Sequence, residues 1–120
     1  MERIIMNTCE KGRLGEDAAV EYLLSKGYTV EQRNYRTKHG EIDIVAKSPE
    51  GVFVFVEVKS AKSRGCGNPL YRVTPAKQKT IIRLARRYMY ERKLSSVPCR
   101  MDVISVFMGK IDHIRNAFFA

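Results

Sequence analysis

Two acidic residues and a lysine at fixed spacing are the part of the sequence best suited to chemistry. Asp43 is followed later in the chain by Glu57, and Lys59 comes two residues after Glu57. Residues i and i+2 of a β-strand share a face, so Glu57 and Lys59 are expected to be neighbours. If residues 41–45 pair with residues 54–59 in a hairpin, Asp43 can lie beside Glu57 on that face.

Paired carboxylates have a specific electrostatic requirement. Two of them held close together repel, and each raises the pKa of the other unless a cation lies between them. A hard divalent ion such as Mg²⁺ or Mn²⁺ meets this requirement with its preference for oxygen ligands. Such an ion lowers the pKa of water and neutralises charge on a scissile phosphate, while Lys59 adds a second cation. The residues therefore predict a metal site for phosphodiester hydrolysis.

Glu16 is a further carboxylate candidate. In a helix over residues 14–26 it shares a face with Ala19, Val20 and Leu23, at 100° per residue. That face should be buried, so a carboxylate is unusual there. Glu16 could reach the Asp43 cluster and hold the water shell of the metal. Glu41 remains an alternative for this accessory role.

A purely structural interpretation exists for each of these residues. Glu41 and Asp43 would form the solvated side of an edge strand, and Glu57 and Lys59 an ion pair at a strand end. For any one residue this is the commoner outcome. For the set it is weaker, because Glu57 continues an apolar face where a lone charge is costly, and Glu16 is independently out of place.

Length and composition limit the class of protein. The chain has 120 residues, 44% of them hydrophobic, and a formal net charge of +9. This predicts one domain over residues 1–120, with a core at about 12–118, and excludes a disordered tail. No apolar run reaches the roughly 18 residues of a membrane span, and no secretory signal is expected. The three cysteines, without a C-x-x-C pair, favour a reducing, cytoplasmic setting.

Other chemical sites are not indicated. His39 and His113 lack partners at the spacing of zinc ligands. The sequence has neither a phosphate-binding G-x-x-x-x-G-K-[ST] run nor a dinucleotide-binding G-x-G-x-x-G run. Cys66, between two glycines and near Arg64, is a weak candidate for a reactive thiol because no base partner is evident.

The positive charge is concentrated in one segment. Residues 59–100 contain twelve of the 22 basic residues and one of the 13 acidic residues. A local cationic field of this kind suits a polyanion, most commonly nucleic acid. A solvated basic face is the alternative interpretation. An anionic membrane is disfavoured because the basic helix lacks an apolar face for lipid.

The elements that must position these residues alternate between helix and strand. The patterns predict helices over 14–26 and 75–94, and strands over 28–34, 41–46, 52–59, 100–108 and 111–115. Residues 35–40 and 60–72 are predicted as loops and 48–51 as a hairpin turn. The run over 52–59 is apolar on both faces, as in a central strand. The order α-β-β-β-α-β-β predicts an α/β fold, with a central mixed sheet flanked by helices.

These motifs resemble a known family. Asp43 and the run Glu57-Val58-Lys59, behind a helical Glu16, look like the PD-(D/E)xK nuclease signature in its archaeal Holliday-junction-resolvase-like form. More closely, the chain is similar to the YraN family of predicted endonucleases. The matching residues span about 12–118: Gly12, Gly15-Glu16, Ala19, Leu23, Gly27, Asn34, Arg36, Gly40-Glu41-Ile42-Asp43, Phe55-Val56-Glu57-Val58-Lys59, Val73, Lys77, Arg100-Met101-Asp102-Val103 and Asn116-Ala117-Phe118.

The resemblance implies a restriction-endonuclease-like fold and a set of roles. Asp43 and Glu57 would be metal ligands, the backbone carbonyl of Val58 would complete the metal shell, and Lys59 would be the catalytic lysine. Glu16 matches the helical glutamate that assists in resolvase-like members. The basic residues expected to contact nucleic acid are Arg36, Lys62, Arg64, Arg72, Lys77 and Arg83. One departure is Ala61, at a position where members often carry a basic residue; here Lys62 follows it.

Three hypotheses follow. The leading one is an Mg²⁺- or Mn²⁺-dependent endonuclease that acts on DNA rather than RNA, branched or otherwise structured. The second is a nucleic-acid-binding module with a nuclease-like fold and no turnover, although a retired site would be expected to lose at least one costly charge. The third is a subunit whose basic helix docks on an acidic protein. Resolvase-like nucleases usually pair two cuts, so a homodimer is expected, with Phe118-Phe119 and the C-terminal hairpin as candidate surfaces.

Overall fold

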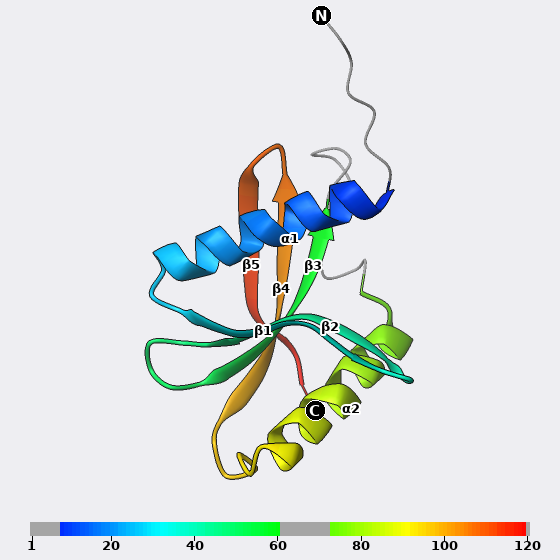
Figure 1. Cartoon of the computed structure of the whole chain (residues 1–120), viewed down its shortest axis with the longest axis vertical. Coiled ribbons are helices and arrows are strands. Elements are labelled where there is room, and N and C mark those ends of the chain that lie inside the picture. Colours follow the sequence, from blue (N-terminus) through cyan, green and yellow to red (C-terminus); the bar gives the residue numbers. More distant parts are fainter. Residues whose placement is uncertain (1–7, 61–72, 120) are drawn as a thin grey trace, which may run out of the picture.

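Two helices and five strands make up the described part of the fold. The computed structural model describes residues 8–60 and 73–119, with residues 8–14 as backbone alone. The elements are α1 (Thr8–Ser25), β1 (Thr29–Thr37), β2 (Gly40–Lys47), β3 (Phe53–Ser60), α2 (Pro75–Glu91), β4 (Cys99–Phe107) and β5 (Lys110–Phe118). The predicted order α-β-β-β-α-β-β is confirmed, and the architecture is consistent with a restriction-endonuclease-like fold (Figure 1).

The sheet is mixed. Its strands lie in the order β1-β2-β3-β4-β5; β3 and β4 are parallel, and the other neighbours are antiparallel. The single parallel pair follows from the long connection through α2, because parallel neighbours need a crossover. The predicted hairpin turn between β2 and β3 is also confirmed, since the Gly51 amide donates to the Ser48 carbonyl at 2.9 Å.

β2 and β3 separate partway along their length. Their pairing runs from Lys47 opposite Phe53 to Ile44 opposite Val56. Beyond that point β2 stays paired with β1 down to Gly40, and β3 stays paired with β4 up to Ser60. In Figure 1, β3 accordingly rises toward the top of the view, whereas β1 and β2 turn to the right. We call the opening beyond Ile44 and Val56 the fork.

Each face of the sheet carries its own apolar layer. On one face Val45 and Phe55 pack with Ile81, Leu84 and other residues of the buried stripe of α2. On the other face, Val54, Val56 and Ile104 pack with residues of α1, including Ala19 and Leu23. The prediction that β3 is covered on both sides is therefore confirmed, and the fork lies between two helices.

Helix α2 begins as predicted. Thr74 accepts a hydrogen bond at Oγ1 from the Lys77 amide at 3.2 Å, and Pro75 takes the first helical position. The cap matters to the site because it sets the position of Lys77 in the first turn.

Several predicted boundaries are wrong. Residues 35–37 belong to β1 rather than to a loop, and Tyr35 is buried, because a register shift between Val30 and Gln32 changes which side chains face the core. Helix α2 ends at Glu91, and α1 begins at Thr8. β5 extends to Phe118, which packs in the core rather than on a surface, while Phe119 is exposed.

The described helices include none that is long and apolar enough to cross a membrane.

Candidate active site at the fork

The acidic pair lies where β2 and β3 separate. Val45 and Phe55 are paired on the α2 side of the sheet, and Asp43 and Glu57 each come two residues further along that same side. The Val58 amide donates a hydrogen bond to Asp43 Oδ2 at 2.8 Å. This bond joins Asp43 to the β3 backbone after the regular strand pairing has ended. Two carboxylates from neighbouring strands therefore meet at the fork.

Burial makes these carboxylates hard to keep charged. Glu57 is only 5% exposed. Burial first, and then the charge of Glu57, raises the pKa of Asp43 to about 7, although the hydrogen bond from the Val58 amide opposes the shift. Burial also raises the pKa of Glu57, against the lowering effect of Lys77 and Lys59. At neutral pH the pair thus favours a proton or another cation.

Two lysines from separate elements approach the two oxygens of Glu57. Lys59 Nζ, on the same strand, lies 3.5 Å from Oε1. Lys77 Nζ, from the first turn of α2, lies 4.0 Å from Oε2 and 3.5 Å from the Glu41 carbonyl oxygen. Sequence reasoning placed Lys77 among the nucleic-acid contacts, and the structure places it beside the acidic pair.

The fit of a divalent metal can be tested on the oxygens at the fork. Glu57 Oε2 is buried and has no hydrogen-bond partner among the described residues. The two carboxylates supply hard oxygen donors. The carbonyl of Val58 faces the same gap as its amide, because both groups of a strand residue point to one side. These donors fit a Mg²⁺ or Mn²⁺ ion that keeps several waters.

The donor set does not enclose an ion. Among residues 15–60 and 73–119, no group of three or more His, Cys, Asp or Glu side chains converges as a metal cage. A site with two carboxylates is sufficient for Mg²⁺ but unlike a structural zinc or calcium site.

Glu16 approaches the fork from α1. Its side chain is 14% exposed, and Oε1 lies 3.4 Å from Arg33 Nε. Burial and the charge of Asp43 raise the pKa of Glu16, while Arg33 lowers it. Glu16 is therefore close enough to sense Asp43, but Arg33 holds it in an ion pair. Glu41, the alternative carboxylate, pairs with Arg36 at 2.6 Å.

The other predicted nucleic-acid contacts are only partly described. Arg36 is exposed, and Arg83 Nη2 lies 3.3 Å from His39 Nε2 on the surface. Three further candidates, Lys62, Arg64 and Arg72, lie outside the described residues, as does Cys66.

A second polar cluster was missed by sequence reasoning. Asp102 is fully buried on the α1 side of the sheet and accepts hydrogen bonds from Arg100 Nε at 3.0 Å and the Asn116 amide at 2.9 Å. Its Oδ2 lies 2.7 Å from His113 Nε2, and His113 Nδ1 lies 2.9 Å from the Tyr22 hydroxyl. The sequence does carry a signal for this cluster, because Asp102 is a charged residue within the apolar alternation of β4. Arg100, counted in the basic segment, is turned inward and belongs to this cluster.

Comparison with known proteins identifies relatives over nearly the whole chain. The model of the uncharacterised protein family UPF0102 matches residues 15–106. A UPF0102 protein of Clostridioides difficile strain 630 is 47% identical over 115 residues, covering 94% of this chain and 100% of the relative. One from Persephonella marina is 44% identical over 108 residues, covering 90% and 92%. Another, from Desulforapulum autotrophicum, is 48% identical over 111 residues, covering 89% and 91%.

Among solved structures, SfsA of Pyrococcus furiosus in complex with Ca²⁺ matches with a TM-score of 0.40 and 17% identity. The match covers 92% of this chain and 64% of that one.

Proposed function

We propose that this chain, which belongs to the uncharacterised protein family UPF0102, is a metal-dependent phosphodiesterase that cuts DNA. The observation that carries the proposal is the pair at the fork, a half-buried Asp43 beside a buried Glu57. One oxygen of Glu57 has no hydrogen-bond partner within the described part of the chain, and two lysines lie beside the carboxylate. Structural ion pairs normally satisfy their oxygens, so the arrangement is suited to an additional cation.

Asp43, Glu57 and the Val58 carbonyl would hold Mg²⁺ or Mn²⁺. When bound, the ion acts as a Lewis acid that neutralises charge on the phosphate and lowers the pKa of water. Ionisation of both carboxylates accompanies binding, because the ion replaces the proton that burial and repulsion favour.

The lysines and Glu16 would act on the substrate and on water. Lys59 and Lys77 place two ammonium groups next to the carboxylates, where they stabilise negative charge that develops on the scissile phosphate. Glu16, near Asp43 on the α1 side, would orient water at the fork. Its ion pair with Arg33 fixes the carboxylate in place.

Nucleic acid is the proposed polymer because the basic segment supplies a sequence-independent attraction for phosphates. DNA is proposed over RNA on the resemblance to resolvase-like nucleases. Branched or otherwise structured DNA is the proposed form of the substrate, on the strength of the resolvase-like motif order.

A cleavage screen tests this proposal. Labelled single-stranded, duplex, flap and four-way DNA would be incubated with the wild type in Mg²⁺, Mn²⁺ or EDTA. We expect metal-dependent products that are lost, by about 100-fold or more, in Asp43→Asn and Glu57→Gln. Asp112→Asn, which removes an exposed carboxylate from β5, is the matched control.

The same screen separates the enzyme from a binding module without turnover. If no substrate is cut with either metal while the wild type binds DNA at low salt, the module is the correct function. If the isolated protein ignores nucleic acid altogether, the basic segment serves a protein partner.

A further inference from the structure

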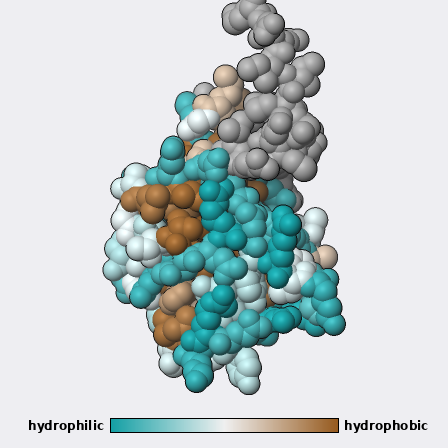
Figure 2. Space-filling view, viewed as in Figure 1, coloured by the Kyte–Doolittle hydropathy of each residue, from teal (hydrophilic) through white to brown (hydrophobic). Residues whose placement is uncertain are grey.

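The outer side of α2 carries a row of exposed side chains that the proposed active site does not use. Lys79, Arg83, Arg86 and Tyr90 recur at intervals of four, three and four residues, so they fall within an arc of about 60°. All four are exposed, and Tyr90 is 77% exposed. We call these four residues the ridge. Figure 2 shows hydrophilic side chains over the lower part of the molecule, where α2 lies.

The ridge retains its positive charge. Within the described part of the chain, none of its three cations forms an ion pair with a carboxylate; Glu91, the single acid of the basic segment, pairs with Arg87 at 2.7 Å. Arg83 contacts the imidazole of His39, which is a neighbour without a fixed negative charge. An uncompensated cationic row of this kind attracts a polyanion.

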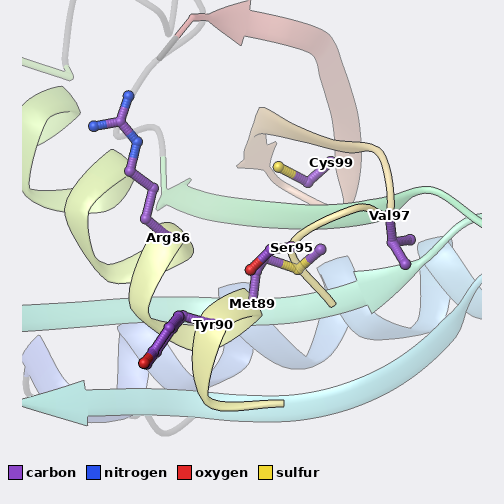
Figure 3. A pocket seen from close by; sticks show the side chains of 6 residues that line it. All are labelled: Arg86, Met89, Tyr90, Ser95, Val97 and Cys99. Atoms are coloured by element: carbon purple, nitrogen blue, oxygen red, sulfur yellow. The ribbon is translucent and has the colours of Figure 1, made fainter. Parts of the chain in front are cut away.

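A pocket adjoins the ridge at its C-terminal end. It has a volume of about 340 Å³. Its lining residues are Arg86, Met89 and Tyr90 of α2, Ser95 and Val97 of the segment that leads into β4, and Cys99 at the start of β4 (Figure 3). The lining combines an apolar floor with a phenol ring and a guanidinium group. In Figure 3 the Arg86 and Tyr90 side chains extend from α2 in different directions. A flat heteroaromatic ring at this pocket would therefore stack on the Tyr90 ring, with the Arg86 cation nearby.

The ridge is separate from the fork. At 100° per residue, Lys77 lies about 160° from Lys79 around the helix, so the two point to opposite sides of α2. Lys77 faces Glu57, and the ridge faces solvent. A strand held on the ridge is therefore not the segment whose phosphate lies at the acidic pair.

We propose that the ridge binds the backbone of a single-stranded nucleic-acid segment and that the adjoining pocket receives one of its unpaired bases against Tyr90. This inference deepens the proposed function, on which its choice of partner rests: the substrate would carry an unpaired arm besides the strand that is cut.

The chemistry of the patch selects this partner. Lys79 and Tyr90 are separated by about 16 Å along the helix, at 1.5 Å per residue, which is long enough for several nucleotides. Stacking on Tyr90 requires a base that is not already stacked in a duplex. A membrane would need a larger apolar face than the helix presents.

Binding measured without turnover tests the inference. Fluorescent oligodeoxythymidine would be titrated in EDTA, so that no metal ion at the acidic pair contributes to binding and no strand is cut. We expect Tyr90→Ala to weaken binding about 5- to 100-fold and Tyr90→Phe to retain it, because stacking needs the ring alone. Phe119→Ala, which removes another exposed aromatic ring, is the matched control and should leave binding unchanged.

The salt dependence of binding tests the cationic part of the ridge separately. Arg86→Ala should lower the slope of log affinity against log salt by about one, whereas Lys110→Ala, an exposed cation of β5, should not. A further measurement uses the wild type. Bound oligonucleotide should slow alkylation of the exposed Cys99 thiol, and peptide mapping would measure the extent of alkylation.

The outcomes separate this inference from the proposed function. One outcome is that oligonucleotide binding depends on Tyr90 but the protein cuts nothing with either metal. This would support the binding site on the ridge and contradict the proposed nuclease activity. Metal-dependent cleavage combined with equal binding by wild type and Tyr90→Ala, and unprotected Cys99, would overturn the ridge and leave the nuclease intact.

Discussion

At the scale of single residues, the site depends on how burial and charge act together on Asp43 and Glu57. A lone carboxylate at either position would be a costly error of patterning. Lys59 and Lys77 match the two carboxylates in number, but burial and the repulsion between Asp43 and Glu57 still make the charged forms costly. Cost of this kind is typical of functional sites, where charges useful for chemistry are kept at the expense of stability.

Because the buried charge of this cluster lowers the stability of the fold, a variant that removes charge from it should be more stable. The raised pKa means that folded Asp43 holds a proton that the unfolded chain releases between about pH 4 and pH 7. Stability from this group is therefore full below the unfolded pKa and falls as pH rises through the folded pKa. In EDTA at pH 8, Asp43→Asn should melt roughly 3–8 °C above the wild type, and the difference should shrink toward pH 5.

Thermal melts followed by circular dichroism would check this expectation. Asp112→Asn should show no such gain at either pH. An Asp43→Asn protein that melts below the wild type at pH 8 would mean that the carboxylate stabilises the fold, as in an ordinary ion pair.

Residue types and spacing were enough to predict that Asp43, Glu57 and Lys59 lie together, because strand periodicity places them on one face. They were not enough to place Lys77 within 4.0 Å of Glu57 or to reveal the ion pair that holds Glu16. The position of Lys77 and the ion pair of Glu16 both depend on how two helices pack over the fork, and this packing cannot be predicted from a local sequence pattern.

At the scale of elements, the order of helices and strands could be predicted from periodicity and turn residues. The boundaries that failed have physical causes. The register shift in β1 interrupts the alternation of inward and outward side chains, so the sequence pattern predicts a loop at Tyr35. Polar residues over much of β5 hid its length, because its pairing with β4 rather than its own hydrophobicity holds it.

The Asp102 cluster ties β4 to β5 and α1, and its loss should destabilise the fold. Asp102→Asn leaves the Arg100 guanidinium without its carboxylate, at an expected cost of about 3–5 kcal/mol. Burial alone would raise the pKa of Asp102, but hydrogen bonds from His113, Arg100 and the Asn116 amide hold it below its ordinary value. Its stabilisation is therefore present above the unfolded pKa and lost in acid.

Urea unfolding at pH 7 and near pH 3 would measure this effect, with Asp112→Asn as the exposed control. Equal midpoints for Asp102→Asn and the wild type at pH 7 would show that the cluster adds nothing to stability.

The β1–β2 hairpin approaches α2 closely at Gly40. A Cβ added there would lie 2.7 Å from Thr80 Cγ2, and the Gly40 φ is +148°. At Gly51, φ is +87° and no atom lies within 4 Å of an added Cβ. Gly40→Ala should therefore cost about 1–3 kcal/mol more than Gly51→Ala, because only the former adds a collision.

A second substitution separates collision from backbone strain. Thr80→Ser removes the methyl group, so it should recover part of the loss in Gly40→Ala when the two are combined. Equal stability of the Gly40 and Gly51 variants in urea would contradict a tight hairpin–helix contact.

At the scale of the whole molecule, charge and topology agree. In the acidic pair between α1 and α2, Glu57 is buried and Asp43 half-buried, while the ridge and most of the described basic segment lie at the surface of α2. The segregation of charge was visible in the sequence. The sequence did not show that the fork lies on the inner side of α2 and the ridge on its outer side. That separation depends on which side of one helix each cation occupies.

Assembly is the part of the expectation that changed most. The sequence offers Phe118 and Phe119 as a candidate dimer surface, but the structure buries Phe118 in the core with residues of α2, so only Phe119 of that pair is exposed. A homodimer stays a prediction, and the C-terminal hairpin stays a candidate surface for it.

The proposed function depends most directly on whether the carboxylates at the fork bind a divalent ion. Electron paramagnetic resonance of free Mn²⁺, titrated with protein at pH 7.5, measures this without any substrate. We predict that the wild type binds Mn²⁺, that Mg²⁺ competes for it, and that Asp43→Asn and Glu57→Gln weaken binding at least about tenfold while Asp112→Asn does not. Equal Mn²⁺ binding by the wild type and both fork variants would contradict the account.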